Sequence, residues 1–196
     1  MGAPMPVQQG TATAPEAAAF ARYDAVAIAF HWLMFVLVAA AYAAIELRGY
    51  TDKGTAARML AMEVHKWAGA LVLALIVPRL LWRVVRGCPA SEPYPRAARL
   101  AAAAMHGLLY LFLLGQPILG LLMTNAAGRV LTVPLLGIGL PPLIAPDPGL
   151  KDLLGDTHET LGKAFYLVIG LHAMVALFHH YMLSDNTLRR MLPRRK

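Results

Sequence analysis

The sequence predicts an all-α membrane protein built as a bundle of four transmembrane helices. Of its 196 residues, 58% are hydrophobic and only 15% are charged, which is too apolar for an ordinary soluble domain. Four long stretches carry almost no charge, and a helix needs only about 20 apolar residues to cross a bilayer. The basic residues gather between and after these stretches, as is typical of membrane topology signals.

Two other classes of protein are disfavoured by composition. The net charge of +7 would suit nucleic-acid binding, but the basic residues are not interleaved with aromatic ones in a way that predicts such a surface. The single cysteine, Cys88, excludes an intrachain disulfide. Covalent c-type haem attachment is excluded as well, because the sequence has no Cys-x-x-Cys-His motif.

The chain divides into a short tail and a membrane domain. Residues 1–21 lack a basic segment followed by an apolar core, so we expect a disordered cytoplasmic tail rather than a secretory signal. Residues 22–196 form the predicted four-helix domain. Its first span covers about 25–47, and its second covers about 60–82.

The third span, about 100–124, has no charged residue but contains Pro117, where we expect a kink. A long Gly- and Pro-rich connection follows over residues 126–157. Its apolar part, Leu131 to Ile144, either enters the membrane interface or caps a site.

The fourth span ends at Leu183, after a run from Ala164 that contains no charged residue. We expect its helix to begin at Asp156, because Glu159 follows three residues later in the arrangement of a capping box. Basic residues are in excess in the N-terminal segment, in the loop between the second and third spans, and in the C-terminal tail. The positive-inside rule therefore predicts that both termini are cytoplasmic.

Four histidines fall at two matched depths in these spans. His158 and His172 are 14 positions apart, so they share one helix face and lie about 21 Å apart along the axis. His31 in the first span reaches the cytoplasmic level of His172. His65 in the second span reaches the external level of His158.

These levels predict two b haems in the bundle core, each with two axial histidines, because a helical bundle holds a cofactor between facing side chains. Arg79 reaches the cytoplasmic level and is a candidate partner for haem propionates, as are Arg22 and Tyr23. Zinc is disfavoured because it needs clustered ligands. A non-catalytic membrane protein, with histidines for packing or proton relay, is an alternative from another class.

Three further histidines lie near the cytoplasmic interface. His179 is about 20° from the face of His172 and His180 about 80° from it, so His179 points better toward the interior. We predict that His179 serves a quinone site at this end, since a histidine with a pKa near neutrality supplies protons. The alternative is that His179 and His180 are interface residues that bond lipid headgroups or backbone carbonyls. The pattern assigns no role to His106 or His180.

Several segments together resemble the bacterial cytochrome b561 family, in particular its superoxide oxidase branch. The resemblance covers about Tyr23 to Arg195 and is most specific in the fourth span. The segments that carry it are Ile28-Ala29-Phe30-His31-Trp32, Glu63-Val64-His65, Leu114-Gly115-Gln116-Pro117-Ile118-Leu119-Gly120, His158-Glu159-Thr160-Leu161, Gly170-Leu171-His172 and Ala176-Leu177-Phe178-His179-His180-Tyr181.

The resemblance implies a multi-pass protein of the bacterial inner membrane with two haem b groups, whose iron ligands are His31, His65, His158 and His172. It also implies electron transfer from superoxide, outside, to ubiquinone. The alternative within the same chemistry is a quinol-oxidising cytochrome b subunit for a dehydrogenase or hydrogenase. The resemblance leaves the identity of any protein partner open.

Overall fold

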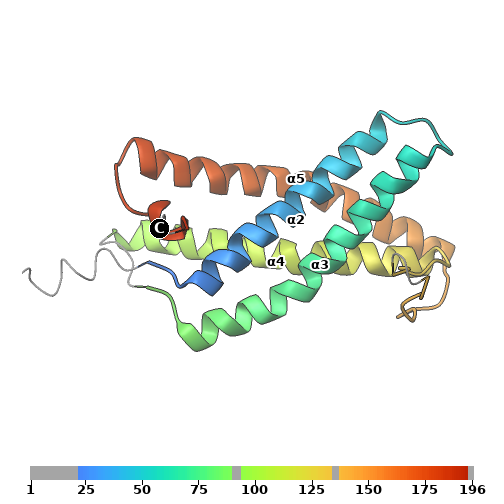
Figure 1. The fold of residues 1–196 in the computed structure, drawn as a ribbon, viewed down its shortest axis with the longest axis horizontal. Coiled ribbons are helices and arrows are strands. Elements are labelled where there is room, and N and C mark those ends of the chain that lie inside the picture. Colours follow the sequence, from blue (N-terminus) through green and yellow to red (C-terminus); the bar gives the residue numbers. More distant parts are fainter. Residues whose placement is uncertain (1–21, 90–93, 134–136, 194–196) are drawn as a thin grey trace, which may run out of the picture.

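Four long helices lie along one axis in the computed structural model, which describes residues 22–89, 94–133 and 137–193 (Figure 1). They are α2 (Ala25–Gly49), α3 (Ala56–Arg86), α4 (Arg96–Ala126) and α5 (Pro148–Tyr181), followed by the short 3-10 helix η1 (Arg189–Met191). The predicted all-α, four-span bundle is confirmed, since all four long helices are long and apolar enough to cross a membrane. The predicted tail, residues 1–21, lies outside the described residues.

The helices pack as two antiparallel pairs. The α2 helix packs mainly on α3, and α5 packs mainly on α4, while α3 and α4 join the pairs. We call the end where α2 and α4 begin and α3 and α5 finish the terminal end. The opposite end, which carries the α2–α3 and α4–α5 connections, is the loop end (Figure 1).

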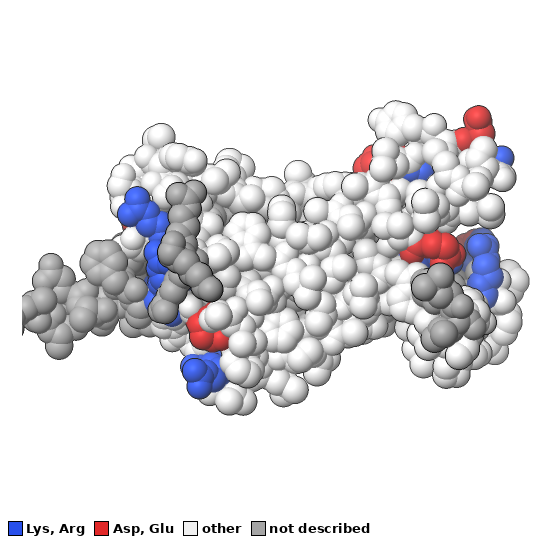
Figure 2. Space-filling model, viewed as in Figure 1, with Lys and Arg blue, Asp and Glu red and all other residues white. Residues whose placement is uncertain are grey.

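Charged side chains are confined to the two ends of the molecule in the face shown in Figure 2. The broad middle band is uncharged, as expected of a segment embedded in hydrocarbon. Large apolar side chains on this band point outward, including Phe35, Leu111 and Leu167. The protein is therefore a multi-pass membrane protein with four candidate spans.

A side-chain cap fixes where α2 begins. The Asp24 carboxylate accepts hydrogen bonds from the backbone N–H groups of Val26 and Ala27, at 3.0 and 3.1 Å, and so caps α2. The same oxygen accepts a hydrogen bond from Trp82 Nε1 at 3.0 Å. The start of α2 is thereby joined to the last turns of α3.

The predicted start of the fourth helix at Asp156 is wrong. The α5 helix begins at Pro148, and Asp147 is its N-cap, accepting a hydrogen bond from the Leu150 N–H at 3.0 Å. A capping aspartate followed by proline at the first helical position is a stronger start signal than a capping box inside a continuous run. His158 therefore lies three turns inside α5 rather than at its beginning.

The small buried core lies between α2, α3 and α4. Its centre is Met34, Val72 and Ile76, against which Tyr110 and Leu113 pack. Few side chains are fully buried, because hydrocarbon replaces protein contacts on the outer faces of membrane helices.

The α4–α5 connection folds back over the loop end. Asn125 is buried, and its amide side chain donates to the Arg129 carbonyl at 3.1 Å and accepts from the Leu143 N–H at 2.9 Å. Leu131 is buried as well, and Trp67 Nε1 on α3 donates to the Thr132 carbonyl at 3.0 Å. The described part of this apolar loop therefore contacts α3 through Trp67, and the capping of a site by the loop stays a prediction.

Candidate cofactor site

Two pairs of histidines face each other across the bundle. His65 on α3 and His158 on α5 have ring centroids 6.0 Å apart, and we call them the loop pair. His31 on α2 and His172 on α5 have ring centroids 6.4 Å apart, and we call them the terminal pair. The structure thus brings together the same two pairs of histidines that were predicted from their depths in the four spans.

The spacing within each pair suits a single metal ion between two imidazoles. Because metal–imidazole bonds are about 2 Å long, two axial rings on one iron have centroids about 6 Å apart. Among the described residues, no group of three or more His, Cys, Asp or Glu could hold a metal ion. The donor set at each level therefore offers two imidazoles, the number of axial ligands that a bis-histidine haem b would take.

Backbone carbonyls orient both rings of the loop pair. His65 Nδ1 lies 2.9 Å from the Ala41 carbonyl oxygen, and His158 Nδ1 lies 3.1 Å from that of Gln116. A carbonyl only accepts, so each Nδ1 carries the proton and each Nε2 keeps its lone pair for a metal. Such outer hydrogen bonds are typical of ligating histidines.

Gly120 on α4 makes space for the loop pair. A Cβ atom at this position would lie 3.2 Å from Cε1 of His158, which is closer than ordinary van der Waals contact. The absence of a side chain at Gly120 therefore lets α4 approach the imidazole of His158 closely.

The terminal pair has a third imidazole beside it. The ring of His106 on α4 lies 5.7 Å from that of His172. The sequence pattern left His106 without a role. Its depth could have been matched to His172 only once α4 had been placed beside α5.

Arg79, a predicted propionate partner, lies at this level. Its Nη1 is 3.8 Å from the Met34 sulfur, and it is within electrostatic reach of His31 and His172. Arg22 is exposed, at the start of the described chain.

Tyr23 is held at the terminal end by the C-terminal segment. Its N–H donates to the Arg190 carbonyl at 3.3 Å, and the Arg190 guanidinium lies 6.0 Å from its ring centroid. Burial raises the pKa of the Tyr23 hydroxyl above its usual range. The structure therefore places Tyr23 in contact with the C-terminal segment.

His179 belongs to a polar cluster at the same end. Its Nδ1 lies 2.5 Å from Asp185 Oδ2 and 3.1 Å from the Tyr94 hydroxyl, which itself donates to Asp185. Burial opposes ionisation of Asp185, but hydrogen bonds from Tyr94, the Thr187 N–H and His179 outweigh it and lower the pKa of the carboxyl group to about 2. Local sequence patterns do not predict this cluster, because Tyr94 and Asp185 are 91 residues apart.

The neighbouring His180 is placed differently. Its Nδ1 is buried and has no hydrogen-bond partner among the described residues. His180 Nδ1 can therefore still form a hydrogen bond, whereas His179 Nδ1 already pairs with Asp185.

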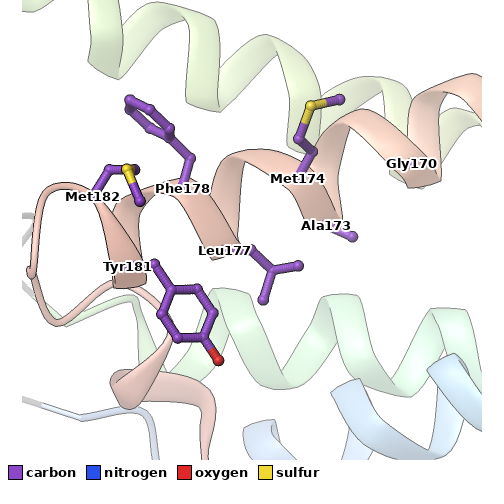
Figure 3. Close-up of a pocket in the computed structure, with 7 residues that line it drawn as sticks. All are labelled: Gly170, Ala173, Met174, Leu177, Phe178, Tyr181 and Met182. Atoms are coloured by element: carbon purple, nitrogen blue, oxygen red, sulfur yellow. The ribbon is translucent and has the colours of Figure 1, made fainter.

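An apolar hollow lies on the outer face of α5 near its end (Figure 3). Its volume is about 470 Å³. Small residues form its floor and large ones its rim: Gly170, Ala173, Met174, Leu177, Phe178, Tyr181 and Met182. The lining of this hollow is almost entirely apolar, as expected of a helix face exposed to lipid.

Comparison with known proteins agrees with this geometry. Residues 22–194 match the family described as prokaryotic cytochrome b561. The chain is 39% identical to cytochrome b561 homolog 1 of Escherichia coli (strain K12), over 89% of this chain and 99% of that protein. It is 33% identical to the probable superoxide oxidase CybB of Yersinia pestis, over 89% of this chain and 98% of that protein. The chain therefore belongs to the prokaryotic cytochrome b561 family of haem b membrane proteins that carry electrons.

Proposed function

We propose that this protein is a superoxide:ubiquinone oxidoreductase with two b haems, one at each histidine pair. In the balanced reaction, two superoxide anions each lose one electron and become dioxygen, while ubiquinone gains two electrons and two protons and becomes ubiquinol. The observation that carries the proposal is the stacking of two imidazole pairs along one bundle, which offers a cofactor site near each end. The name of the Yersinia pestis relative, probable superoxide oxidase, supports the choice of donor.

The four histidines hold the cofactors in this proposal, with His31 and His172 as one ligand pair and His65 and His158 as the other. When bound, haem b supplies a reversible one-electron iron couple. The carbonyls of Ala41 and Gln116 keep Nε2 of the loop pair directed at the iron position.

Both termini are cytoplasmic in this proposal, and the loop end is external. Arginines predominate at the terminal end, whereas basic and acidic residues are balanced at the loop end. The positive-inside rule assigns the arginine-rich end to the cytoplasm. The described arginines of that end are Arg22, Arg83, Arg86, Arg96, Arg99, Arg189 and Arg190.

Arg48 is the residue that we assign to attract superoxide at the loop end. The lysines around it already pair with carboxylates, as Lys66–Glu63, Lys151–Asp152 and Lys163–Glu159. Arg48 Nε, in contrast, is buried without a hydrogen-bond partner among the described residues. Its charge reaches Glu159, the residue after His158, and a fixed cation there raises the local concentration of an anion.

We place ubiquinone at the terminal end, with its isoprenoid tail in the α5 hollow (Figure 3). We assign His180, which lies on the last turns of α5 beside the residues of this hollow, to hydrogen-bond a quinone oxygen. The His179–Asp185 pair lies at the same end, and histidine is the side chain that most often transfers protons in enzymes. Proton delivery is therefore the role that we assign to His179.

The decisive experiment uses the purified protein without any partner. Enzymatically generated superoxide should reduce the haem band and yield one ubiquinol for every two superoxide anions, and superoxide dismutase should abolish both signals. If ubiquinol reduces the haem band and superoxide does not, the protein is a quinol-linked electron-transfer subunit. If the protein has no reducible haem band at all, the assignment of the histidines as ligands is wrong.

A further inference from the structure

Two arginines on α3 converge on one tyrosine of α4. Arg79 Nε lies 3.5 Å and Arg83 Nη1 lies 3.4 Å from the hydroxyl oxygen of Tyr110. The two guanidinium carbons lie 5.9 and 5.6 Å from the centroid of the Tyr110 ring. Three side chains from two helices therefore form one cradle of hydrogen-bond donors.

The charges of this cradle are not balanced by the protein. Like charges four residues apart on a helix repel each other, and a cation inside a membrane span is costly. None of the ion pairs among the described residues involves Arg79 or Arg83. The side chains that accept their hydrogen bonds, the Tyr110 hydroxyl and the Met34 sulfur, are neutral. A bound anion would offset the cost of holding these two cations inside the span.

The cradle lies beside the terminal pair. The charge of Arg79 reaches His31, His106 and His172. Tyr110 packs on the buried cluster around Met34, so the cradle is fixed by the core between the helices. An anionic group bound to the cradle would therefore be part of a ligand that lies between His31 and His172.

We infer that Arg79, Arg83 and Tyr110 bind the propionate groups of the haem at the terminal pair. The inference rests on the proposed function, because it needs a haem between His31 and His172. A guanidinium fork matches a carboxylate with two parallel hydrogen bonds, and Tyr110 supplies a further donor. The new members of the site are Arg83 and Tyr110.

A lipid phosphate has similar chemistry and is the competing source of the anion. Arg79 is seven residues before the end of α3, which places it about 10 Å below that end. This depth favours a ligand from the interior of the bundle over a headgroup at the membrane surface.

The test measures the reduction potential of each haem against pH in Arg83→Gln and Tyr110→Phe, with resonance Raman spectra of the propionate bending modes. Loss of a cation beside a propionate disfavours the reduced haem. We expect Arg83→Gln to lower the potential of one haem only, to steepen its pH dependence and to shift its propionate modes. Tyr110→Phe should shift the same modes. Repeating the titration in a His65→Ala background, in which we expect only the terminal haem, identifies the haem affected.

Arg86→Gln is the matched control. Arg86 is one turn beyond Arg83 on α3, and its guanidinium lies over the Trp82 ring, 5.8 Å from the centroid. It should leave both haems unchanged, so an equal shift in Arg86→Gln overturns the inference as a general charge effect. In Arg83→Lys, which keeps the charge but loses the fork, the potential should be retained and the propionate modes should still shift.

Two outcomes would overturn the inference, and the second of them assigns the anion to lipid. Unchanged propionate modes in both Arg83→Gln and Tyr110→Phe overturn the inference. A parent potential that shifts when anionic lipid nanodiscs are replaced by zwitterionic ones, together with an Arg83→Gln variant that does not respond, also overturns it and assigns the cradle to lipid. A parent protein without haem refutes the proposed function itself, which pyridine haemochrome assay detects independently.

Discussion

Gly120 determines how closely α4 approaches the imidazole of His158. A methyl group there would lie 3.2 Å from His158 Cε1, so the ring would have to move by a few tenths of an ångström. The position of a ligating ring affects both cofactor affinity and potential. The size of the residue at position 120, which itself binds no metal, therefore affects the position of the His158 ring.

The matched test is Gly120→Ala against Gly115→Ala. Both positions lie in α4, and a Cβ at Gly115 would have no atom within 4 Å. Each substitution gains helix propensity of up to about 1 kcal/mol, so that effect cancels in the comparison. We expect only Gly120→Ala to change the low-spin EPR signal of the loop-pair haem. Equal EPR spectra for both variants would show that the His158 ring moves to accommodate the added methyl group without any change at the haem site.

At the same scale, His65→Ala should remove one haem and leave the other. His65 and His31 lie in different pairs, so the loss of one imidazole leaves the terminal pair intact. We expect half of the haem of the parent protein by pyridine haemochrome assay. Retention of all the haem, or loss of all of it, would contradict two independent sites.

A third test at the residue scale concerns Arg48. Arg48→Gln should slow haem reduction by superoxide roughly tenfold at low ionic strength, since loss of steering charge lowers an on-rate by about 10-fold or more. Haem content and quinone reduction by dithionite-reduced protein should be unchanged. Lys53→Gln, at an exposed lysine of the same end, is the control. An effect of equal size in both variants would assign steering to the whole surface rather than to Arg48.

At the scale of elements, residues 184–193, which follow α5, lie across the terminal end, and we call this segment the strap. Trp32 Nε1 on α2 donates to the Met191 carbonyl at 2.8 Å, and the Tyr23 N–H donates to Arg190. Asp185 fastens the beginning of the strap through Tyr94 and His179. The strap therefore connects α2 and the segment before α4 to the end of α5.

We expect Asp185→Asn to loosen this strap. Hydrogen bonds to charged groups contribute about 1.5–3 kcal/mol each, so opening should become roughly tenfold to a hundredfold more frequent. Trypsin cleavage after Arg189, or amide exchange of residues 184–193, measures opening. Asp152→Asn at the loop end should have no effect on either rate.

The pH dependence of the strap has a definite sign. The pKa of Asp185 is lowered from 3.8 to about 2, so folding favours its ionised form. Its contribution is complete above pH 3.8 and disappears as the pH falls toward about 2. Amide exchange of parent protein and Asp185→Asn should therefore converge in acid. A difference that persists at pH 2 would mean that another group fastens the strap.

How much the sequence predicts differs from one element to another. Spans and histidine pairs follow from local patterns, because hydrophobic length and helical spacing are properties of single segments. The start of α5 was misplaced because Asp156 and Glu159 imitate a cap inside a helix that Asp147 and Pro148 already begin. The Tyr110 cradle and the Tyr94–Asp185 cluster depend on which helices are neighbours, and spacing within one segment does not contain that information.

At the scale of the whole molecule, the two ends differ in charge. The terminal end is rich in arginine, whereas acidic and basic residues are balanced at the loop end. This difference supports the orientation that the proposed function requires, in which superoxide arrives from outside.

Cys88 provides a natural reporter of orientation. It is the only cysteine, and it is exposed at the terminal end, just after α3. A membrane-impermeant maleimide should label it in inverted membrane vesicles and not in intact spheroplasts. A cysteine placed at Lys53 in a Cys88→Ser background should give the opposite pattern. Labelling of Cys88 in spheroplasts would reverse the proposed topology.

The distribution of the histidines has a consequence for biosynthesis. Each pair takes one imidazole from α5, and α5 follows the other three long helices in the sequence. At about 5–20 residues per second, the first three helices spend several seconds in the membrane without a complete ligand pair. A chain that stops before Pro148 has neither pair, even though His31, His65 and His106 are already in place. In the proposed function, neither haem can therefore gain both of its ligands before α5 has been made, and completion of α5 makes both sites competent at nearly the same time.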